Sequence, residues 1–571
     1  MATRHRIGET INETRTGDVV KYFQHLNTMI EENSGNHDYK IISTDCYANS
    51  APILNEGHTK FALTDTSVDI IDISKGYLNL KLELDIQYVF TNVVSDSQPL
   101  LSTATGLNKN NRLYFFIGFK SGSQFIKQYK VFSNGRLTCC KNTEAKYEQT
   151  IVYNSKAQEE IISRPGLYSP HANVMKMSDC VCGIYDYIEV NTNITTPQSK
   201  HIEIDLCIQI DDLLPFSGMM YYPRCACGEL EIEIAGTLMQ NMVFCPIPHE
   251  VAMEHEGIRI EDPQVAGYVN TQNRFDSYLK FTERVTDFRF NQCGDFAKIS
   301  FPFISQLPVE NNVDDHDLQV GLINNAYVTI NPSSIKIREA KSYIHGFNVV
   351  DSCVQALKQM VANEGLIIRG QWNEWYALAQ TPSATQIRCN IQVPMSNVSQ
   401  LIFTFPNSSN QLTVSRNPHL ESIQCHVQDR IIPDKSISTL DRAHSEMILN
   451  ALGLDTLFSA SKELIESLTK NRGKVGDWSL MKRSDDMYML VINLERGGSG
   501  VIDGMSGLNV PINLNGNFIN SNQNPHYYQI SNTDGTTIKH CPFNINMFVL
   551  SDAYWKFGPN GGEYIINESL E

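Results

Sequence analysis

Apolar and polar residues alternate along many short stretches of this chain. From Leu78 to Ile86 every second residue is leucine or isoleucine, and the residues between them are asparagine, lysine, glutamate and aspartate. In an extended strand this period of two sends one row of side chains into a core and the other toward water or a partner. The pattern favours antiparallel sheets, because parallel strands are buried on both faces and read as continuous apolar runs.

The alternation returns in both halves of the chain. It is found at residues 202–210, 230–234, 401–405, 423–427, 488–494 and 510–514. Between these stretches lie segments such as "FPNSSN" and "ERGGSG", whose Asn, Ser, Gly and Pro residues favour turns and interrupt strand pairing. Short strands separated by such segments predict β-sandwiches.

Helical spacing of apolar residues is confined to a few segments, at residues 156–162, 354–361, 439–452 and 456–468. Strands and helices do not alternate in the way that a parallel sheet or a nucleotide-binding fold requires. We therefore expect an all-β chain with short helices in the connecting loops.

The length of the chain predicts two domains. Its 571 residues, 42% of them hydrophobic and 19% charged, exceed what one core usually supports. The acidic, asparagine-rich segment 307–318 lies between two strand-rich regions of similar length. We expect an N-terminal arm at 1–44, a first sandwich at 45–308, and a second at 309–571 with a helical insertion near 439–468.

The charge of the chain limits its partners. A formal net charge of −17 argues against nucleic acid as the principal partner, because phosphate binding needs clustered Lys and Arg. Basic residues such as Arg4, Arg6 and Arg15 occur near the start among glutamates, which allows a weak contact at most. No apolar run is long enough to span a membrane, and the start lacks the apolar segment of a secretory signal.

The 14 cysteines are dispersed, as expected for reduced, mostly buried thiols of a protein made in the cytosol. The pairs Cys180-x-Cys182 and Cys225-x-Cys227 could supply four zinc ligands. The one-residue spacing favours a different interpretation, in which both members of each pair point into a core from one face of a strand.

Catalytic motifs fail on spacing. The segment after His249 begins like a zinc-protease helix, but His255 is six residues away instead of four. Gly473-Lys474 lacks the first glycine and the Ser or Thr of a phosphate-binding loop. Acidic pairs such as Asp314-Asp315 and Asp485-Asp486, and Asp503, are expected at the surface. We predict no enzyme activity and no catalytic, cofactor-binding or metal-binding residues.

The tryptophans leave two interpretations open. Trp372, Trp375, Trp478 and Trp555 could form a platform for a sugar, or they could be large anchors in sandwich cores and subunit interfaces.

Several landmarks in fixed order carry a family resemblance. They are "DTSVDIIDISKGYLNLKLELDI" (65–86), "CVCGIYDY" (180–187), "IDDLLPFSGMMYYP" (210–223), "VPMSNVSQLIFTFPNSSNQLTVSRNPHLESIQCHV" (393–427), "LERGGSGVIDGMSGLNVPINLNG" (494–516) and "LSDAYWKF" (550–557). Together they resemble the major capsid proteins of Polintons (Mavericks), adintoviruses and virophages, within the double jelly-roll lineage. The resemblance spans most of residues 60–560.

The resemblance implies two consecutive jelly-roll β-sandwiches and a major capsid protein. Homotrimers would form pseudo-hexameric capsomers in the icosahedral capsid of a double-stranded DNA virus or virus-like transposon. The implied partners are neighbouring capsomers, penton and minor capsid proteins, and packaged DNA through a weak contact of the N-terminal arm. The implied location is the virion, after synthesis in the host cytoplasm and assembly in the cytoplasm or nucleus.

Two alternatives remain at this point. A tandem β-sandwich that binds or hydrolyses carbohydrate would have similar strands and asparagine-rich loops, although such proteins are often secreted. A single jelly-roll shell protein of a small single-stranded DNA virus would have one core and very long loops.

The Gly561-Gly562 step resembles sites cut by viral maturation proteases, but Pro559 stands where an aliphatic residue would be expected.

Overall fold

The structure is a computed structural model of the full chain. It describes residues 26–44, 58–92, 112–119, 121–142, 151–153, 155–164, 166, 183–189, 198–236, 243–246, 297–305, 321–363, 365–378, 386–405, 415, 417–418, 420–439, 441–454, 459–460, 462–469, 488–494, 505–518, 529–531, 538–540, 545–558 and 561–566.

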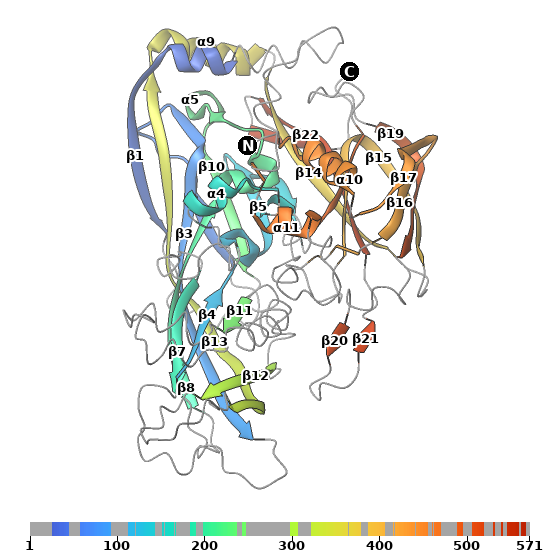
Figure 1. The fold of residues 1–571 in the computed structure, drawn as a ribbon. Helices are drawn as coiled ribbons and strands as arrows, with labels where there is room; N and C mark the ends of the chain where they lie inside the picture. The colour runs from blue at the N-terminus through green and yellow to red at the C-terminus, as the bar shows by residue number, and fades with distance from the viewer. Residues whose placement is uncertain are drawn as a thin grey trace.

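The first β unit is built on a long antiparallel sheet (Figure 1). Its strands, in spatial order, are β1 (Ser34–Thr44), β13 (Gly321–Val349), β3 (Ile70–Asn92) and β8 (Gln198–Gln209), with β12 (Ala297–Ser305) beside β13 and β9 (Tyr221–Tyr222) beside β3. The alternation predicted from Leu78 to Ile86 is confirmed, because the apolar row of β3 is buried and the polar row is not.

A second antiparallel sheet packs against the first one. It contains β2 (His58–Ala62), β10 (Leu230–Gly236), β5 (Ile126–Ser133) and β6 (Arg136–Lys141). Apolar residues of both sheets, among them Leu82, Val131 and Ile232, share one buried cluster, which we call the first core. The sandwich expected in the first half is therefore present.

Smaller elements complete the first β unit. A three-stranded sheet consists of β11 (Val243–Pro246), β4 (Arg112–Gly118) and β7 (Gly183–Glu189). The short helices are η1 (Gly122–Phe125), α4 (Gln158–Ser163), η3 (Ile210–Asp212), η4 (Leu214–Phe216) and α5 (Arg224–Cys227). The helix predicted at 156–162 is thus confirmed as α4.

The second β unit is built on an eight-stranded antiparallel sheet. Its main path is β14 (Leu366–Leu378), β22 (Ile545–Gly558), β15 (Gln386–Thr404), β19 (Met505–Phe518), β16 (Leu420–Val427) and β17 (Arg430–Ile437), with β18 (Leu490–Asn493) beside β15 and β23 (Gly561–Ile566) beside β22. A separate pair is formed by β20 (Gln529–Ser531) and β21 (Ile538–His540). The apolar residues, among them Phe403, Val427 and Ile512, form a second core.

A bend in β15 lets one strand serve two parts of this sheet. Its first part pairs with β19, and its last part pairs with β18 on one side and β22 on the other. The register shifts between Met395 and Val398, where Asn397 has a φ of 50°. An asparagine tolerates this left-handed conformation better than most residues, and the resulting bulge redirects the strand.

Three further helices follow β13 in the described part of the chain. They are α9 (Asp351–Asn363), which connects β13 to β14, and the neighbours α10 (Arg442–Leu452) and α11 (Lys462–Thr469). They confirm the helical segments predicted at 354–361, 439–452 and 456–468. Among the described residues, no helix combines the length and the apolar character needed to cross a bilayer.

The last part of β15 departs from the single-faced burial that its alternation predicts. Residues 401–404 are buried on both faces of the strand. Helix α10 supplies part of the cover, since the side-chain amide of Gln400 donates a hydrogen bond of 2.7 Å to the carbonyl of Ala451. Strand alternation alone does not show whether a helix will pack on the more polar face.

The pairing of β13 bears on the division of the chain. Residues 326–347 pair with β3, and residues 340–349 pair with β1. This groups β13 with the first β unit, although it follows the expected division between 308 and 309. The division between 308 and 309 stays a prediction. In the structure, strand pairing with the first β unit continues as far as Val349.

The end of the expected N-terminal arm is part of the first β unit. Residues 26–32 are helical, and β1 follows them as an outer strand of the long sheet. Leu26 and Ile30 are one helical turn apart, so they share a face, and both are buried in the first core. Among the described residues the first strand begins at Ser34, within the expected arm 1–44.

We expect Ile30→Ala to destabilise the protein by about 2–5 kcal/mol, because it removes a fully buried side chain from a packed core. Urea denaturation measures this loss. Thr28→Ala on the exposed face of the same helix is the matched control and should change stability by less than about 0.5 kcal/mol. Equal stability of the two variants would show that this helix does not dock on the core.

Candidate functional site

The two cores meet along one end of the second unit's sheet. Leu366 and Ile368 of β14, and Trp555 and Phe557 of β22, belong to the first core, although their strands pair within the second β unit. Further along the same strands, residues such as Leu378 and Met547 belong to the second core. We call the shared part, residues 366–373, 551–558 and 561–566, the seam.

Trp555 is the central anchor of the seam. It is fully buried, and its indole Nε1 donates a hydrogen bond of 3.0 Å to the carbonyl of Pro215 in η4. Its ring stacks on Phe216, with the centroids 5.9 Å apart. At Gly370 an added Cβ would lie 2.7 Å from the same Pro215 carbonyl, so the close approach of η4 to β14 requires glycine there.

Side chains from two other strands contact the backbone of β14. Lys141, at the end of β6, is buried, donates from Nζ to the carbonyl of Asn373, and lies 4.3 Å from the centroid of the Trp372 ring. The hydroxyl of Tyr564 in β23 donates a hydrogen bond of 2.8 Å to the carbonyl of Gln371. These contacts satisfy carbonyl groups of a strand at the end of the sheet order. The Lys141 contact joins the two units, and the Tyr564 contact lies within the second unit.

A segment of the first unit also reaches the second one. Ile151 lies in the second core, and Ala157 forms an isolated antiparallel bridge with Ala460, which lies just before α11. This segment is held at its base by a buried group of charges. Lys156 Nζ lies 3.2 Å from Asp212 Oδ1, and Arg164 forms ion pairs with Asp211 and Asp212.

The charge balance of this group explains its burial. Desolvation alone lowers the pKa of Arg164, but the attraction of Asp212 and Asp211 outweighs it and raises the pKa above the usual value. The guanidinium therefore stays charged and paired. Removing one partner of a buried pair leaves an uncompensated charge, which is strongly destabilising.

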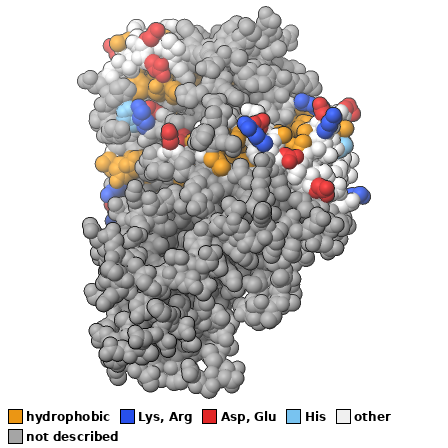
Figure 2. All heavy atoms as spheres, in the orientation of Figure 1, with side chains coloured by type: hydrophobic (Ala, Val, Ile, Leu, Met, Phe, Trp, Pro, Cys, Tyr) orange, Lys and Arg blue, Asp and Glu red, His pale blue; other side chains and the backbone are white. Residues whose placement is uncertain are grey.

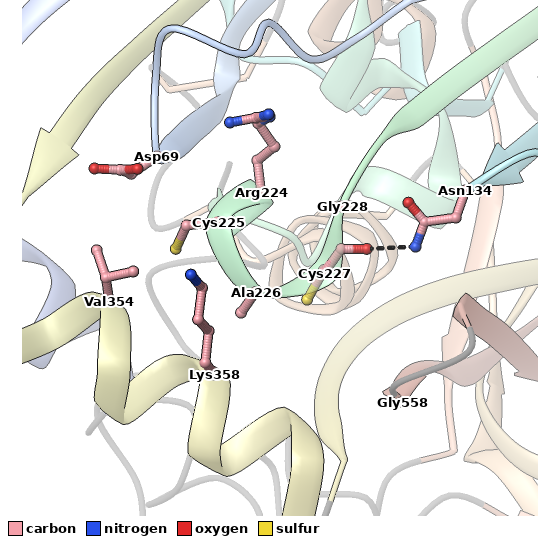
Figure 3. A pocket seen from close by; sticks show the side chains of 10 residues that line it. All are labelled: Asp69, Asn134, Arg224, Cys225, Ala226, Cys227, Gly228, Val354, Lys358 and Gly558. Carbon is pink, nitrogen blue, oxygen red and sulfur yellow. Dashed lines mark hydrogen bonds between the residues drawn. The ribbon is translucent and has the colours of Figure 1, made fainter. Parts of the chain in front are cut away.

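A polar cavity of about 430 Å³ lies between α5 and α9 (Figure 3). Asp69 and Arg224 of the first unit, Lys358 of α9 and Gly558 at the end of β22 contribute to its wall. Arg224 Nη1 donates to the carbonyls of Thr66 at 3.0 Å and Val68 at 3.3 Å, so this side chain braces the entry of β3.

The cysteines of this cavity do not occupy a strand. Cys225 and Cys227 lie on the short helix α5, so the expectation that they share one face of a strand is wrong. Residues two apart on a helix do not share a face, and Figure 3 shows both cysteines on this helical turn beside the cavity. Cys227 is buried and Cys225 half-buried. Cys180 and Cys182 lie outside the described residues.

The environment keeps both thiols protonated. Burial, followed by the nearby Asp69 carboxylate, raises the pKa of Cys225 to about 11. Burial, followed by Cys225, also raises the pKa of Cys227. Since the thiolate is the nucleophile, neither protonated thiol is activated for nucleophilic attack near neutral pH.

The structure distinguishes the two interpretations of three tryptophans. Trp555 and Trp372 lie in the seam, and Trp375 is half-buried against the second core. They are anchors of cores and of the contact between the units, not an exposed platform for a sugar. Gly561 and Gly562 pair with Gly558 and Phe557, so this dipeptide is part of a sheet.

Other candidates named from the sequence lie outside the described residues. They are His249, His255, Asp314, Asp315, Gly473, Lys474, Trp478, Asp485, Asp486 and Asp503. The N-terminal residues Arg4, Arg6 and Arg15 also fall there. The expectation that the chain has no catalytic, cofactor-binding or metal-binding residue stays a prediction.

His444 is the most strongly perturbed histidine in the described part of the chain. It lies on α10, is fully buried, and its Nε2 is 2.9 Å from the hydroxyl of Tyr488. The two rings are stacked with centroids 6.0 Å apart. Burial lowers the pKa of His444 to about 4 and raises the pKa of Tyr488 above its usual range, so both side chains are neutral near pH 7.

The described surface in Figure 2 carries acidic and basic side chains close to one another, with apolar groups between them. No extended single-sign patch appears among the described residues on this face. This distribution differs from the clustered positive charge that binding to phosphate backbones requires.

Solved structures offer a comparison for the whole chain. The chain is similar to a chain of the Sputnik virophage, at 9% sequence identity and a TM-score of 0.47, with 94% of this chain and 89% of that chain covered. It is also similar to the mavirus major capsid protein, at 9% identity, a TM-score of 0.43, and coverage of 93% and 90%. It is similar as well to the Faustovirus major capsid protein, at 8% identity and a TM-score of 0.38, with 96% of this chain and 100% of that chain covered. No family model and no curated protein matches the chain.

We expect Trp555→Ala to destabilise the protein by about 3–5 kcal/mol, because it empties the centre of the seam. Trp555→Phe keeps an aromatic ring but leaves the Pro215 carbonyl without its donor, which should cost about 1–3 kcal/mol. Urea denaturation followed by circular dichroism measures both losses. Lys435→Ala on the exposed part of β17 is the control, and equal stability of all three variants would refute the anchoring role.

Stability should fall in acid because of His444. Its folded pKa of about 4 is below the usual histidine value of 6.5, so the unfolded chain binds the proton more readily between these pH values. The contribution is fully present above about pH 6.5 and decreases by about 3 kcal/mol as the pH falls to 4. In His444→Gln this part of the pH dependence should vanish from urea denaturation curves recorded between pH 7 and 4; an unchanged profile would contradict the assignment.

Proposed function

We propose that this chain is the major capsid protein of an icosahedral shell, belonging to a double-stranded DNA virus or a virus-like transposon. The observation that carries the proposal is the seam. Two antiparallel β units are held together by the buried hydrogen bonds of Trp555 to Pro215 and of Lys141 to Asn373. The ordered landmarks between residues 60 and 560 support the same assignment. The similar solved structures include the major capsid proteins of mavirus and Faustovirus.

A shell subunit needs such a joint. Three copies with two β units each would place six similar units around an axis, which approximates six-fold packing. The proposed capsomer is thus a pseudo-hexameric homotrimer. Modest contacts that recur around symmetry axes add up through multivalency, provided that each copy presents its two units at a constant angle.

The outermost strand of the second unit suggests how copies avoid uncontrolled association. At the edge strand β17, Pro433 cannot donate a backbone hydrogen bond, and the neighbouring Asp434 and Lys435 are exposed. Proline and charges on an edge strand discourage pairing with strands of other chains. We infer that copies contact one another through side-chain faces and loops, not through a shared sheet.

The remaining parts of the proposal concern location and partners. The protein would act as a structural component of the virion, without enzyme activity, after synthesis in the host cytoplasm and assembly in the cytoplasm or nucleus. Its partners would be neighbouring capsomers, penton proteins and minor capsid proteins. The arm before residue 26 would lie beneath the shell and make a weak contact with packaged DNA. Within each copy, the division between the jelly rolls would fall after β13, near Val349.

The oligomeric state tests this function. Size-exclusion chromatography with light scattering should show a stable trimer, and negative-stain images should show particles of hexagonal outline. A monomer that stays monomeric at high protein concentration, particularly one that binds a carbohydrate array, would contradict the proposal and favour the tandem sandwich that binds or hydrolyses sugars.

A further inference from the structure

Four neighbouring side chains on the polar face of the long sheet are of kinds that can bind metal ions: two glutamates, an aspartate and a histidine. In the register of β3 and β8, Glu83 lies directly opposite Glu203, and Asp85 lies directly opposite His201. The residues between them in each strand, such as Leu84 and Ile202, point into the first core. The two strands therefore hold all four polar side chains on one face.

Three of these residues converge. One ligand atom each from Glu83, His201 and Glu203 lie within 4.8 Å of one another. Their side chains are 29%, 54% and 46% exposed, so a hydrated ion has access to them. Among the described residues, this is the one cluster of three or more His, Cys, Asp or Glu side chains with such spacing.

Asp85 prepares the histidine for coordination. Its Oδ1 lies 2.8 Å from Nδ1 of His201. When Nδ1 carries the proton of this hydrogen bond, Nε2 keeps the lone pair that binds a metal. A carboxylate that orients a histidine in this way is a common companion of metal-bound imidazoles.

Arg338 of β13 is the competitor for this cluster. Its Nη1 lies 2.7 Å from Glu203 Oε1 and 3.5 Å from Glu83 Oε1, which offsets the repulsion between the two opposed glutamates. The arginine side chain is itself 56% exposed. Exposed ion pairs contribute little free energy, so a divalent cation can replace the guanidinium at small cost.

We propose that Glu83, His201 and Glu203 bind a divalent transition-metal cation of the Zn²⁺ type, with Asp85 orienting the imidazole and Arg338 competing for the carboxylates. The histidine selects for zinc and its neighbours over Mg²⁺ and Ca²⁺, which prefer oxygen ligands. Three protein ligands leave at least one coordination position for water or for a donor from another molecule. The site lies within one copy of the chain and does not rest on the proposed capsid function.

Isothermal titration of the chelator-treated full chain with ZnCl₂ tests the site. The wild type should bind one saturable Zn²⁺ per chain. His201→Ala and Glu203→Gln should each weaken binding at least about 10-fold, and Asp85→Asn should weaken it about 10-fold to 100-fold. His58→Ala is the matched control, because His58 is an exposed strand histidine with Nδ1 3.3 Å from Glu233, and its loss should leave zinc binding unchanged.

The Arg338→Gln variant distinguishes a metal-binding role of these residues from a purely structural one. It should strengthen zinc binding, because the competing cation is gone, while thermal melts without zinc show an unchanged or slightly lowered midpoint. The proposal is overturned if the wild type binds no zinc at millimolar concentration. It is equally overturned if His201→Ala binds as the wild type does, which would mean adventitious surface binding, or if Arg338→Gln weakens binding. Circular dichroism of each variant verifies that it is folded.

Discussion

Burial of one end of β14 and β22 in the core of the other β unit is the constraint on which the molecule depends. Trp555 pairs within its own sheet, yet its indole bonds to Pro215 and its ring stacks on Phe216. Because the strand is continuous through both cores, the units cannot separate without exposing apolar surface from each. Lys141 adds a polar contact between the units, because it donates from β6 of the first unit to the Asn373 carbonyl of the second.

The seam also explains how the architecture manages its sheet edges. The carbonyls of β14 at the seam are satisfied by Lys141 and Tyr564, which keeps that edge from pairing elsewhere. The outer strand β17 has proline and charges instead. Both kinds of protection limit pairing with strands of other chains, to which an open edge is prone.

The alternation of side chains in the long sheet has two physical outcomes. The apolar rows of β3 and β8 are buried in the first core, and this burial stabilises the two strands. The polar rows face away from that core and can bind ions. The strand register places two glutamates, an aspartate and a histidine side by side on this face. Arg338, from a strand more than a hundred residues later, balances their charge.

The sequence by itself determined the class of the fold. Period-two alternation predicts β3, β8, β10, β16 and β19, and apolar helical spacing predicts α4, α9, α10 and α11, because both depend on neighbours a few residues away. Only tertiary structure decided that β13 pairs with β1 and β3, that Cys225 and Cys227 lie on a helix, and that Trp555 is buried in the other unit's core.

Tertiary structure also brought Glu83, His201 and Glu203 together. The sequence shows each of them only as a polar position of a predicted strand. Their meeting depends on pairing between strands distant in sequence, and a pattern of nearest neighbours contains no information on that register.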